Sequence, residues 1–503
     1  MLTPGSLSFR RAAIVCGSIV AAVYLGIKIP DEPFFFMLML GVAGYVFTLP
    51  LNYRWLAWLI IATAPSAIIL PGLPGRPFLW EACSLAAWPS LVAYFALNRR
   101  RLTEVQLGVE ARRAAVCLII YIGVLVLVML VRGVGFRVFG GEQMGGRFYV
   151  QQLILAILPL LLLTVDWRER TLLAAFYTGI ALTVTYLVSD LVFVYGGRST
   201  EFLLYFLELP TDAINFYIGH ELSGLRRFQS FAFVGDALFL CLLSVLPLRR
   251  IFGGKMYIGL PWLLGAVLLG LASGHRTILV QAVCTLAFLG AIQRVYTPMC
   301  LIGLSLVLAI GGWGLFNHAS ELPLGVQRSI SFIPGLKVDP LASADAEATL
   351  NDRIEALKLG LNDVPRYLWI GRGFGLARLD KHTAGTADDS IMIAYESGYF
   401  DNGVIGLLLK TGLVGLLAAL GYLWFISRAA LHCVALVGTR PEAGRDTFDL
   451  YCQLMVAKWF ALVVFFLFLR GDASTFMQVF ALASAVILLC LKFQQRRAEA
   501  FRL

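Results

Sequence analysis

The sequence predicts an all-α fold, a polytopic membrane helix bundle of about 12–14 transmembrane helices with one large loop outside the membrane. Two observations lead to this prediction. The 503 residues are 59% hydrophobic and only 14% charged, against roughly 45–50% apolar and 25% charged residues in soluble domains. Apolar runs of about 20 residues, the length that crosses a bilayer, also recur along the whole chain. A net charge of +10 could suggest nucleic acid, but the basic residues do not form one patch.

Hydropathy places the individual spans. They lie near residues 11–29, 33–50, 55–72, 79–97, 113–131, 148–165, 171–195, 231–248, 256–273, 275–293, 298–316, 401–426, 449–469 and 474–491. The first has the basic flank and apolar run of a signal peptide, but it is interpreted as an uncleaved span because many more follow. Since the number of spans is even, both termini are expected on one side.

Basic residues indicate which side that is. About half of the 41 Lys and Arg residues lie in connections on the side of the N-terminus, including the cluster 98–113 and the pair Arg249 and Arg250. The positive-inside rule therefore predicts that both termini are cytoplasmic. The chain is expected to divide into helices over 1–316, an outer loop over 317–400 and C-terminal helices over 401–503.

The outer loop contains one segment with a clear helical pattern. Residues 343–365 are expected to form an amphipathic helix that Ser343 caps and Pro365 stops. Its apolar face recurs at helical spacing and consists of Leu350, Ile354, Leu357, Leu361 and Val364. Arg353 lies at the edge of this face, and the glycine-rich stretch 370–375 is expected to form a turn.

Charged residues gather at the predicted outer ends of the spans. They are Arg227, His275, Arg276, Arg353, Glu396 and Asp401. Arginine binds phosphate oxygens with a two-pronged guanidinium that stays charged, and a carboxylate can accept a proton from an attacking hydroxyl. The set therefore predicts a site for an anionic lipid substrate. No zinc site is expected, because the nine cysteines form no CxxC pair. No other metal site is expected, because Asp388 and Asp389 lack partner ligands.

Simpler roles remain open for each of these residues. Arg276 at a span end is also a typical snorkelling anchor, and Arg353 could be an ordinary surface charge. Asp401 or Asn402 would make a good N-cap for the span that follows. Lys410, inside that span, could reach the surface, pair with a carboxylate such as Asp236, or face a polar cavity.

Four segments form an ordered pattern. In the first, Asp401-Asn402 is followed by nine residues and then by Gly412-Leu-Val-Gly415. The second, residues 272–282, opens a span with Arg276. The third, residues 353–375, leads from Arg353 to a GxG turn, and the fourth, residues 227–239, joins Arg227 to Gly235-Asp236. Together they resemble the O-antigen ligase and O-antigen polymerase superfamily of bacterial glycan-assembly proteins. That family has a histidine at the position of Asp401 and Pro-Asn in place of Gly235-Asp236. The resemblance covers roughly residues 225–425.

The resemblance implies metal-independent, inverting transfer of a glycan from an undecaprenyl-diphosphate donor to a hydroxyl acceptor, at the periplasmic face of the cell inner membrane. By position, Arg276 and Arg353 would bind the diphosphate and Asp401 would be the base. The expected substrate-binding residues are Arg227, His275, Glu396, Asn402 and Lys410. No cofactor is expected. The implied partners are the donor and acceptor glycans, the lipid bilayer, a chain-length regulator and a flippase, with no nucleic acid.

The missing histidine favours a polymerase of repeat units, for exopolysaccharide or O-antigen, over a ligase that attaches finished chains to a lipid A core. A flippase or transporter is an alternative, in which Lys410, Lys458 and Asp190 would be intramembrane substrate or proton sites. Another alternative is a lipid-carrier glycosyltransferase that needs a metal.

Overall fold

The computed structural model describes residues 41–71, 76–97, 108–133, 146–208, 230–252, 256–273, 276–296, 305, 309, 312–374, 400, 402–440, 445–469 and 471–500. This part of the chain is almost entirely helical, and it contains two isolated β-bridges but no strand. Five of its helical segments are long and apolar enough to cross a membrane: Val109–Arg132, Glu169–Tyr195, Gly403–Gly438, Thr447–Phe468 and Ala473–Ala500. These findings confirm the all-α class and the prediction of a membrane protein. The predicted span 11–29 and most of 298–316 lie outside the described residues.

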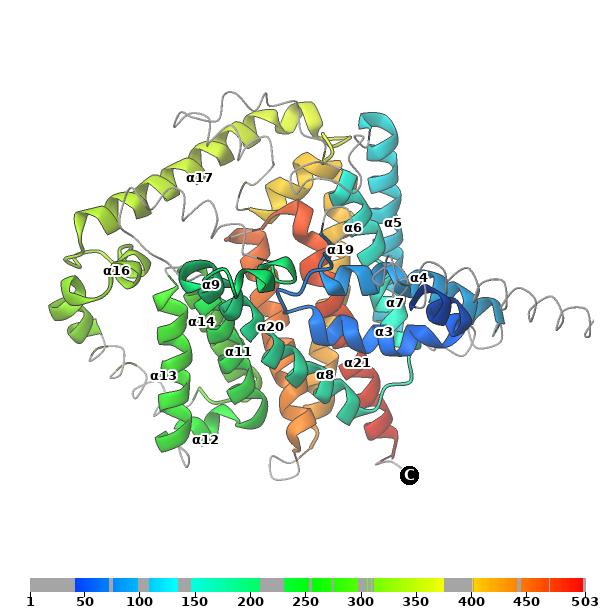
Figure 1. Ribbon diagram of the computed structural model, residues 1–503, viewed down its shortest axis with the longest axis horizontal. Helices are drawn as coiled ribbons and strands as arrows, with labels where there is room; N and C mark the ends of the chain where they lie inside the picture. The colour runs from blue at the N-terminus through cyan, green and yellow to red at the C-terminus, as the bar shows by residue number, and fades with distance from the viewer. Residues whose placement is uncertain are drawn as a thin grey trace, which may run out of the picture.

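The larger of two hydrophobic cores is built around four long helices that run side by side in Figure 1. They are α5 (Val109–Arg132), α19 (Gly403–Gly438), α20 (Thr447–Phe468) and α21 (Phe476–Ala500). Buried small residues of α19, such as Gly415, Ala419 and Ala430, allow neighbouring backbones to approach closely. The rings of Tyr422 and Phe476 fill the space between these helices.

Shorter helices complete this core. They are α3 (Leu49–Thr63), α4 (Leu79–Leu97), α6 (Gly146–Leu155), α7 (Leu158–Thr164) and α8 (Glu169–Leu182). Helix α9 (Val184–Tyr195) follows α8, but its residues lie outside this core. In Figure 1, α3 and α4 lie across the direction of the long helices. Short 3₁₀ turns are η2 (Glu201–Tyr205), η3 (Ala319–Glu321) and η5 (Ala473–Thr475).

A second core lies on the other side of α20. It is formed by α11 (Ser230–Val245), α12 (Leu248–Phe252), α13 (Met256–Ala272) and α14 (Arg276–Ile292), and Leu454 and Ala457 of α20 belong to it. A Cβ atom at Gly235 would lie 2.7 Å from the carbonyl oxygen of Ala266, so α11 and α13 require a glycine here. Since α20 also contributes to the first core, this helix joins the two halves.

An arm of two helices, α16 (Leu324–Ile330) and α17 (Pro340–Tyr367), extends over one end of the molecule (Figure 1). We call this end of the molecule the arm end. The end at which α21 finishes is called the opposite end. Ser329 of α16 donates a hydrogen bond to the carbonyl of Leu271, at the end of α13, at 3.4 Å. From there α17, 28 residues long and therefore about 42 Å, crosses to the top of α19.

Helix α17 differs from its prediction in both bounds and packing. It begins earlier, because Asp339 rather than Ser343 is the N-cap and accepts from the Leu341 amide at 2.8 Å. It passes through Pro365 and ends at Tyr367. The predicted apolar face is not the buried one: Leu350 is 50% exposed. Among the α17 residues whose side chains are described, those that are buried are small: Ala342, Ala346, Ala356 and Gly360.

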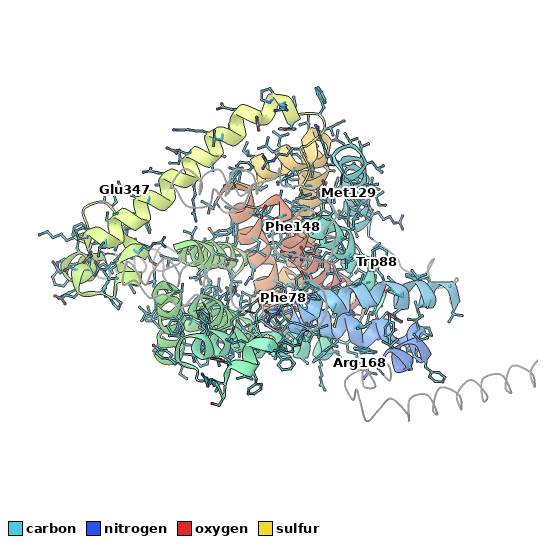
Figure 2. The ribbon with its side chains drawn as sticks, turned by 45° about the horizontal axis from the view of Figure 1, so that its top comes forward. Phe78, Trp88, Met129, Phe148, Arg168 and Glu347 are labelled. Atoms are coloured by element: carbon cyan, nitrogen blue, oxygen red, sulfur yellow. The ribbon has the colours of Figure 1, made fainter. Side chains whose placement is uncertain are left out.

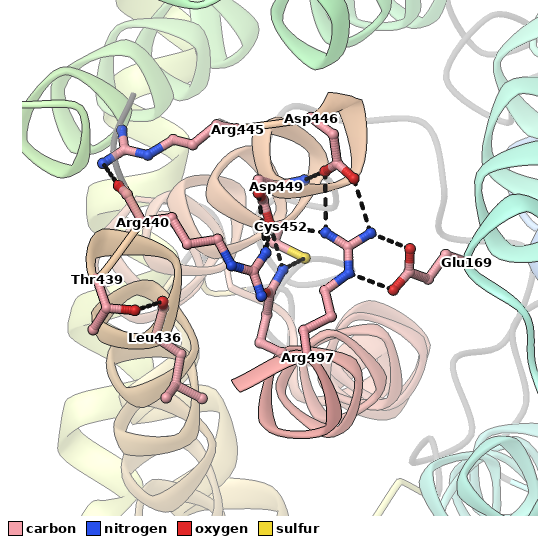
Figure 3. Close-up of polar contacts among 10 residues, drawn as sticks. Glu169, Leu436, Thr439, Arg440, Arg445, Asp446, Asp449, Cys452 and Arg497 are labelled. Atoms are coloured by element: carbon pink, nitrogen blue, oxygen red, sulfur yellow. Dashed lines mark hydrogen bonds and ion pairs between the residues drawn. The ribbon is translucent and has the colours of Figure 1, made fainter. Parts of the chain in front are cut away.

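At the opposite end, an ion-pair network ties α21 to α8 and α20 (Figure 3). The guanidinium of Arg497 donates to Glu169, to Asp446 at 2.9 Å and to Asp449 at 3.3 Å. Arg440 donates to Asp449 at 2.9 Å from the end of α19. Burial raises the pKa of Asp446, but hydrogen bonds from Arg497 and from the Asp449 amide outweigh it and leave this pKa lowered. A carboxyl group whose pKa is lowered by folding stabilises the fold at pH values above its pKa in the unfolded chain, about 3.9. This stabilisation is lost as the pH falls further.

Replacing Arg497 by glutamine is expected to lower the free energy of unfolding by about 2 kcal/mol at pH 7, because three carboxylates lose their shared cation. Thermal unfolding in detergent measures this effect. The exposed neighbour Arg496 provides a matched control, since Arg496→Gln should leave Tm unchanged. The difference should shrink below about pH 4 as the carboxylates protonate. Equal Tm values for the two variants at pH 7 would contradict this assignment.

Candidate functional site

The predicted site residues fall into three groups. Arg227, His275, Glu396 and Asp401 lie outside the described residues. Arg276 is the first residue of α14, which begins at the arm end, although the position of its side chain lies outside the description. Three predicted residues have described side chains: Arg353, Asn402 and Lys410.

The site is organised by a break in α19 at Gly412. This residue has φ of +75° and ψ of −179°, a conformation that L-residues with a side chain rarely adopt. A break inside a membrane helix leaves backbone carbonyl and amide groups without their helical partners, which is costly where water is absent. These groups need partners from elsewhere in the chain.

Residues 368–374, which directly follow α17, supply those partners, and we call them the latch. The amides of Arg372 and Gly373 donate to the carbonyls of Leu409 and Lys410 at 2.7 and 3.1 Å. The amide of Leu413 donates to the carbonyl of Leu368 at 2.7 Å. The break in α19 is therefore closed by the chain that ends the arm.

The glycines of the two motifs explain the close fit of the latch. A Cβ atom at Gly412 would lie 2.5 Å from the carbonyl oxygen of Trp369, and one at Gly371 would collide with the backbone of Lys410. Gly373 has φ of +81°, and a Cβ there would collide with the Tyr149 hydroxyl. The GxG turn and the GxxG pattern, which are distant in sequence, are thus two sides of one contact.

Lys410 is buried beside the latch with an exposure of only 1%. Its ammonium lies 5.6 Å from the ring centroid of Phe374, a distance suited to a cation–π contact. Lys410 also interacts electrostatically with Asp472, which precedes η5. Of the open alternatives, pairing with Asp236 is wrong, because Asp236 pairs with Lys458 at 2.5 Å.

Aromatic residues fix the latch from the side of α6. The Phe374 amide donates to the Tyr149 hydroxyl at 3.0 Å, and the Tyr149 ring meets the Phe374 ring edge-on at 5.0 Å. Phe148, labelled in Figure 2, lies 6.4 Å from the same ring. The latch is therefore held by backbone and side-chain contacts together.

Two arginines that the sequence pattern does not indicate as site residues also lie at the latch. Arg132, at the end of α5, donates from Nε to the carbonyl of Gly371 at 3.1 Å. Arg372, within the latch, is half-buried and its guanidinium lies 5.6 Å from the ring centroid of Phe400. In the sequence, Arg372 is marked only by its place between two glycines. Its place at the latch becomes apparent only from the way this turn docks on α19.

Asn402 is the N-cap of α19. Its side-chain oxygen accepts from the amides of Val404 and Ile405, both at 3.1 Å. Of the two candidates for this cap, Asn402 fills the role. The other candidate, Asp401, lies outside the described residues.

Arg353 lies near the middle of α17 and is half-buried. It shares a helix face with Ala356 and Gly360, and a Cβ at Gly360 would lie 2.8 Å from the ring of Phe400. The opposite side of the helix is exposed at Glu347, labelled in Figure 2. Arg353 is therefore turned towards the protein, seven residues before the point where α17 meets the start of α19.

The charges named for a transporter have structural partners. Lys458 is paired with Asp236, and these residues connect α20 to α11. Asp190 is fully buried and accepts from the first amide of α11, that of Ser230, at 2.9 Å. Lys458 and Asp190 thus both take part in contacts between helices of the bundle.

Comparison with protein-family models and with curated proteins finds no match to this chain. Within the described residues, no group of three or more His, Cys, Asp or Glu side chains could hold a metal ion. Asp388 and Asp389 lie outside them. The class that the fold defines is a polytopic, all-α membrane protein.

Replacing Gly412 by alanine is expected to lower the free energy of unfolding by about 2 kcal/mol, because the left-handed backbone is strained and the new methyl group meets Trp369. Gly438, at the far end of the same helix, has open space around it. Gly438→Ala is therefore the matched control and should leave stability unchanged within about 0.5 kcal/mol. Thermal unfolding and limited proteolysis after residue 374 measure the effect. A Gly412→Ala protein as stable and protected as the control would disprove the latch.

Proposed function

We propose that this chain is a polymerase of undecaprenyl-diphosphate-linked oligosaccharide repeat units, acting at the periplasmic face of the cell inner membrane. The observation that carries the proposal is the course of α17. Its first residues follow α16, which is bonded to the end of α13 next to the start of α14 at Arg276, and its last residues lead to the break in α19 (Figure 1). Segments that resemble three separate motifs of glycan polymerases thus lie at one end of the bundle.

The positively charged side chains at the arm end support an anionic substrate. Arg353 faces the protein from α17, and Arg276 begins α14 beneath the arm. Guanidinium groups at the surface of a membrane suit a lipid diphosphate, because they bind its oxygens in pairs and remain charged. In the proposed reaction Arg276 and Arg353 hold the diphosphate, with Arg227 as a third contact.

The reaction is a direct displacement with inversion. The acceptor hydroxyl oxygen attacks the anomeric carbon of the donor sugar, and its proton passes to Asp401. The bond from that carbon to the diphosphate oxygen breaks, and undecaprenyl diphosphate leaves with the electron pair. Stabilisation of this leaving charge by the arginines is the largest contribution to catalysis. The donor supplies the energy, so the scheme uses no metal and no nucleotide.

The remaining predicted residues have supporting roles in this scheme. His275, Glu396 and Asn402 are assigned to contacts with the sugars. Lys410 is too deeply buried for a direct sugar contact, so it contributes through its charge. A chain-length regulator and a flippase are the proposed partners. Transfer of finished chains to a lipid A core, as in a ligase, is the second form of the same chemistry.

Replacing Arg353 by alanine is expected to reduce polymer formation at least about 100-fold, because one cation is lost from the leaving group. The assay is the lipid-linked material in a strain that lacks the gene and carries either the wild-type or the variant chain. Single repeat units on the carrier should accumulate in the deletion strain and with Arg353→Ala.

The exposed residue Lys358, on the same helix, gives the matched control, since Lys358→Ala should restore full polymer. Long chains left on the carrier in the deletion strain would identify a ligase. Material trapped in the inner leaflet would identify a flippase. Full polymer with Arg353→Ala would overturn the proposed role of Arg353.

Replacing Asp401 by asparagine tests the base separately. Since Asn402 already caps α19, this variant should keep the Tm of the wild type while transfer falls by about 10²–10⁴-fold, the range typical of a lost general base. Transfer is measured with purified protein and a lipid-linked donor. Normal transfer by Asp401→Asn would show that the proton goes elsewhere.

A further inference from the structure

We propose that one face of α17 binds the surface of the lipid bilayer, so that the arm is an interfacial helix on the leaflet at the arm end. This face, which we call the apolar strip, consists of Leu350, Ile354, Leu357 and Leu361. The inference goes beyond the proposed function and does not depend on it. Its consequence for the site is that Arg353, near the middle of α17, is held at the level of the lipid head groups.

The apolar strip is not covered by protein. Leu350, Ile354 and Leu361 are 50%, 42% and 48% exposed, and Leu357 is half-buried. The four residues recur at helical spacing, so their side chains form one continuous surface about 18 Å long. A contiguous apolar surface of this kind marks a site where a protein meets a membrane or a partner.

The apolar strip lies between the buried face and the polar face of α17. Successive residues of an α-helix are rotated by about 100°. Leu361 is therefore the neighbour of Gly360 on the helix surface, and Gly360 closely approaches the ring of Phe400. Asn362, a further 100° round, is exposed, as is Glu347 on the same polar face (Figure 2). A helix with this order of faces can contact protein, lipid and water at once.

The attachments of the arm identify the bilayer as the surface that covers the strip. Ser329 bonds the start of the arm to Leu271, at the end of the apolar helix α13. The latch bonds the other end to α19, which is long enough to cross a membrane. The helix between these attachments runs along one end of the bundle (Figure 1). The bilayer surface is thus always within its reach, whereas a protein partner would first have to be recruited.

Aromatic side chains at both ends of the arm fit the same surface. Phe332, just after α16, is 55% exposed, and Trp369, in the latch, is 72% exposed. Aromatic residues, tryptophan above all, are enriched where a membrane meets water, because the ring is apolar while the indole N–H stays hydrated. The apolar strip therefore has an exposed aromatic side chain beyond each of its ends.

The charges of α17 indicate that the apolar strip, rather than an electrostatic attraction, holds the helix on the bilayer. The exposed charged residues include Glu347 and Glu355 as well as Lys358 and Arg366. Because both signs are present, the helix has little preference for anionic head groups, and its binding depends on the apolar area that it buries. The contact should therefore persist at a salt concentration that screens exposed charges.

Fluorescence quenching tests this contact with the purified full chain in nanodiscs. A fluorescent amino acid replaces either Ile354, in the strip, or Leu359, an exposed leucine of the same helix that is rotated from Ile354 by about 140°. Lipids with a spin label near the head group should quench the first position at least about two-fold more than the second. Iodide, a quencher dissolved in the water, should give the reverse order, and high salt should leave both results unchanged.

Two outcomes would overturn the proposal. One is equal quenching of the two positions by each quencher. The other is a label at Ile354 that neither quencher reaches, because another protein surface would then cover the strip. If the protein labelled at Ile354 does not fold, Leu361 and its exposed neighbour Asn362 form a second pair that decides in the same way. Polymer formation is not measured in this experiment, so the proposed function stands or falls separately.

Discussion

The architecture of the arm end depends on one constraint: backbone groups inside a membrane must find hydrogen-bond partners. Gly412 interrupts α19 and releases carbonyl and amide groups that lipid cannot satisfy. Residues 368–374 satisfy them, and this requires glycines on both sides of the contact. The end of α17 is therefore attached to the membrane bundle by the same bonds that repair the broken helix.

This attachment links elements that belong to different parts of the chain. One end of the arm is bonded to α13 through Ser329, and the other is inserted into α19. Helix α20 lies in both hydrophobic cores and holds the two halves of the bundle together beneath the arm. As a result, the start of α14, the middle of α17 and the start of α19 are connected through rigid helices, and a substrate between them would meet a prearranged set of groups.

Hydropathy and length were sufficient for the fold class, because a bilayer imposes the same requirement on every span. The packing of α17 could not be predicted in the same way. Its leucines mark one apolar face, yet the residues that it buries are alanines and Gly360. At Gly360 the close approach of Phe400 leaves no room for a side chain. Likewise, the sequence predicts a continuous span across Gly412, because glycine is common in membrane helices and its φ angle does not follow from the sequence. The place of Arg372 cannot be predicted for a related reason, since a turn between two glycines gives no sign of where it docks. The cap at Asn402, in contrast, is one of two positions that the sequence indicates.

The position of the latch in the chain also matters while the protein is being made. The residues that close the break precede α19 in the chain, so they have already been synthesised when α19 enters the membrane. The unsatisfied carbonyls of Leu409 and Lys410 thus need not persist in lipid while a later segment is awaited. A circular permutation that moved the latch behind α19 would reverse this order and expose the broken helix during insertion, although every contact of the finished protein would remain possible.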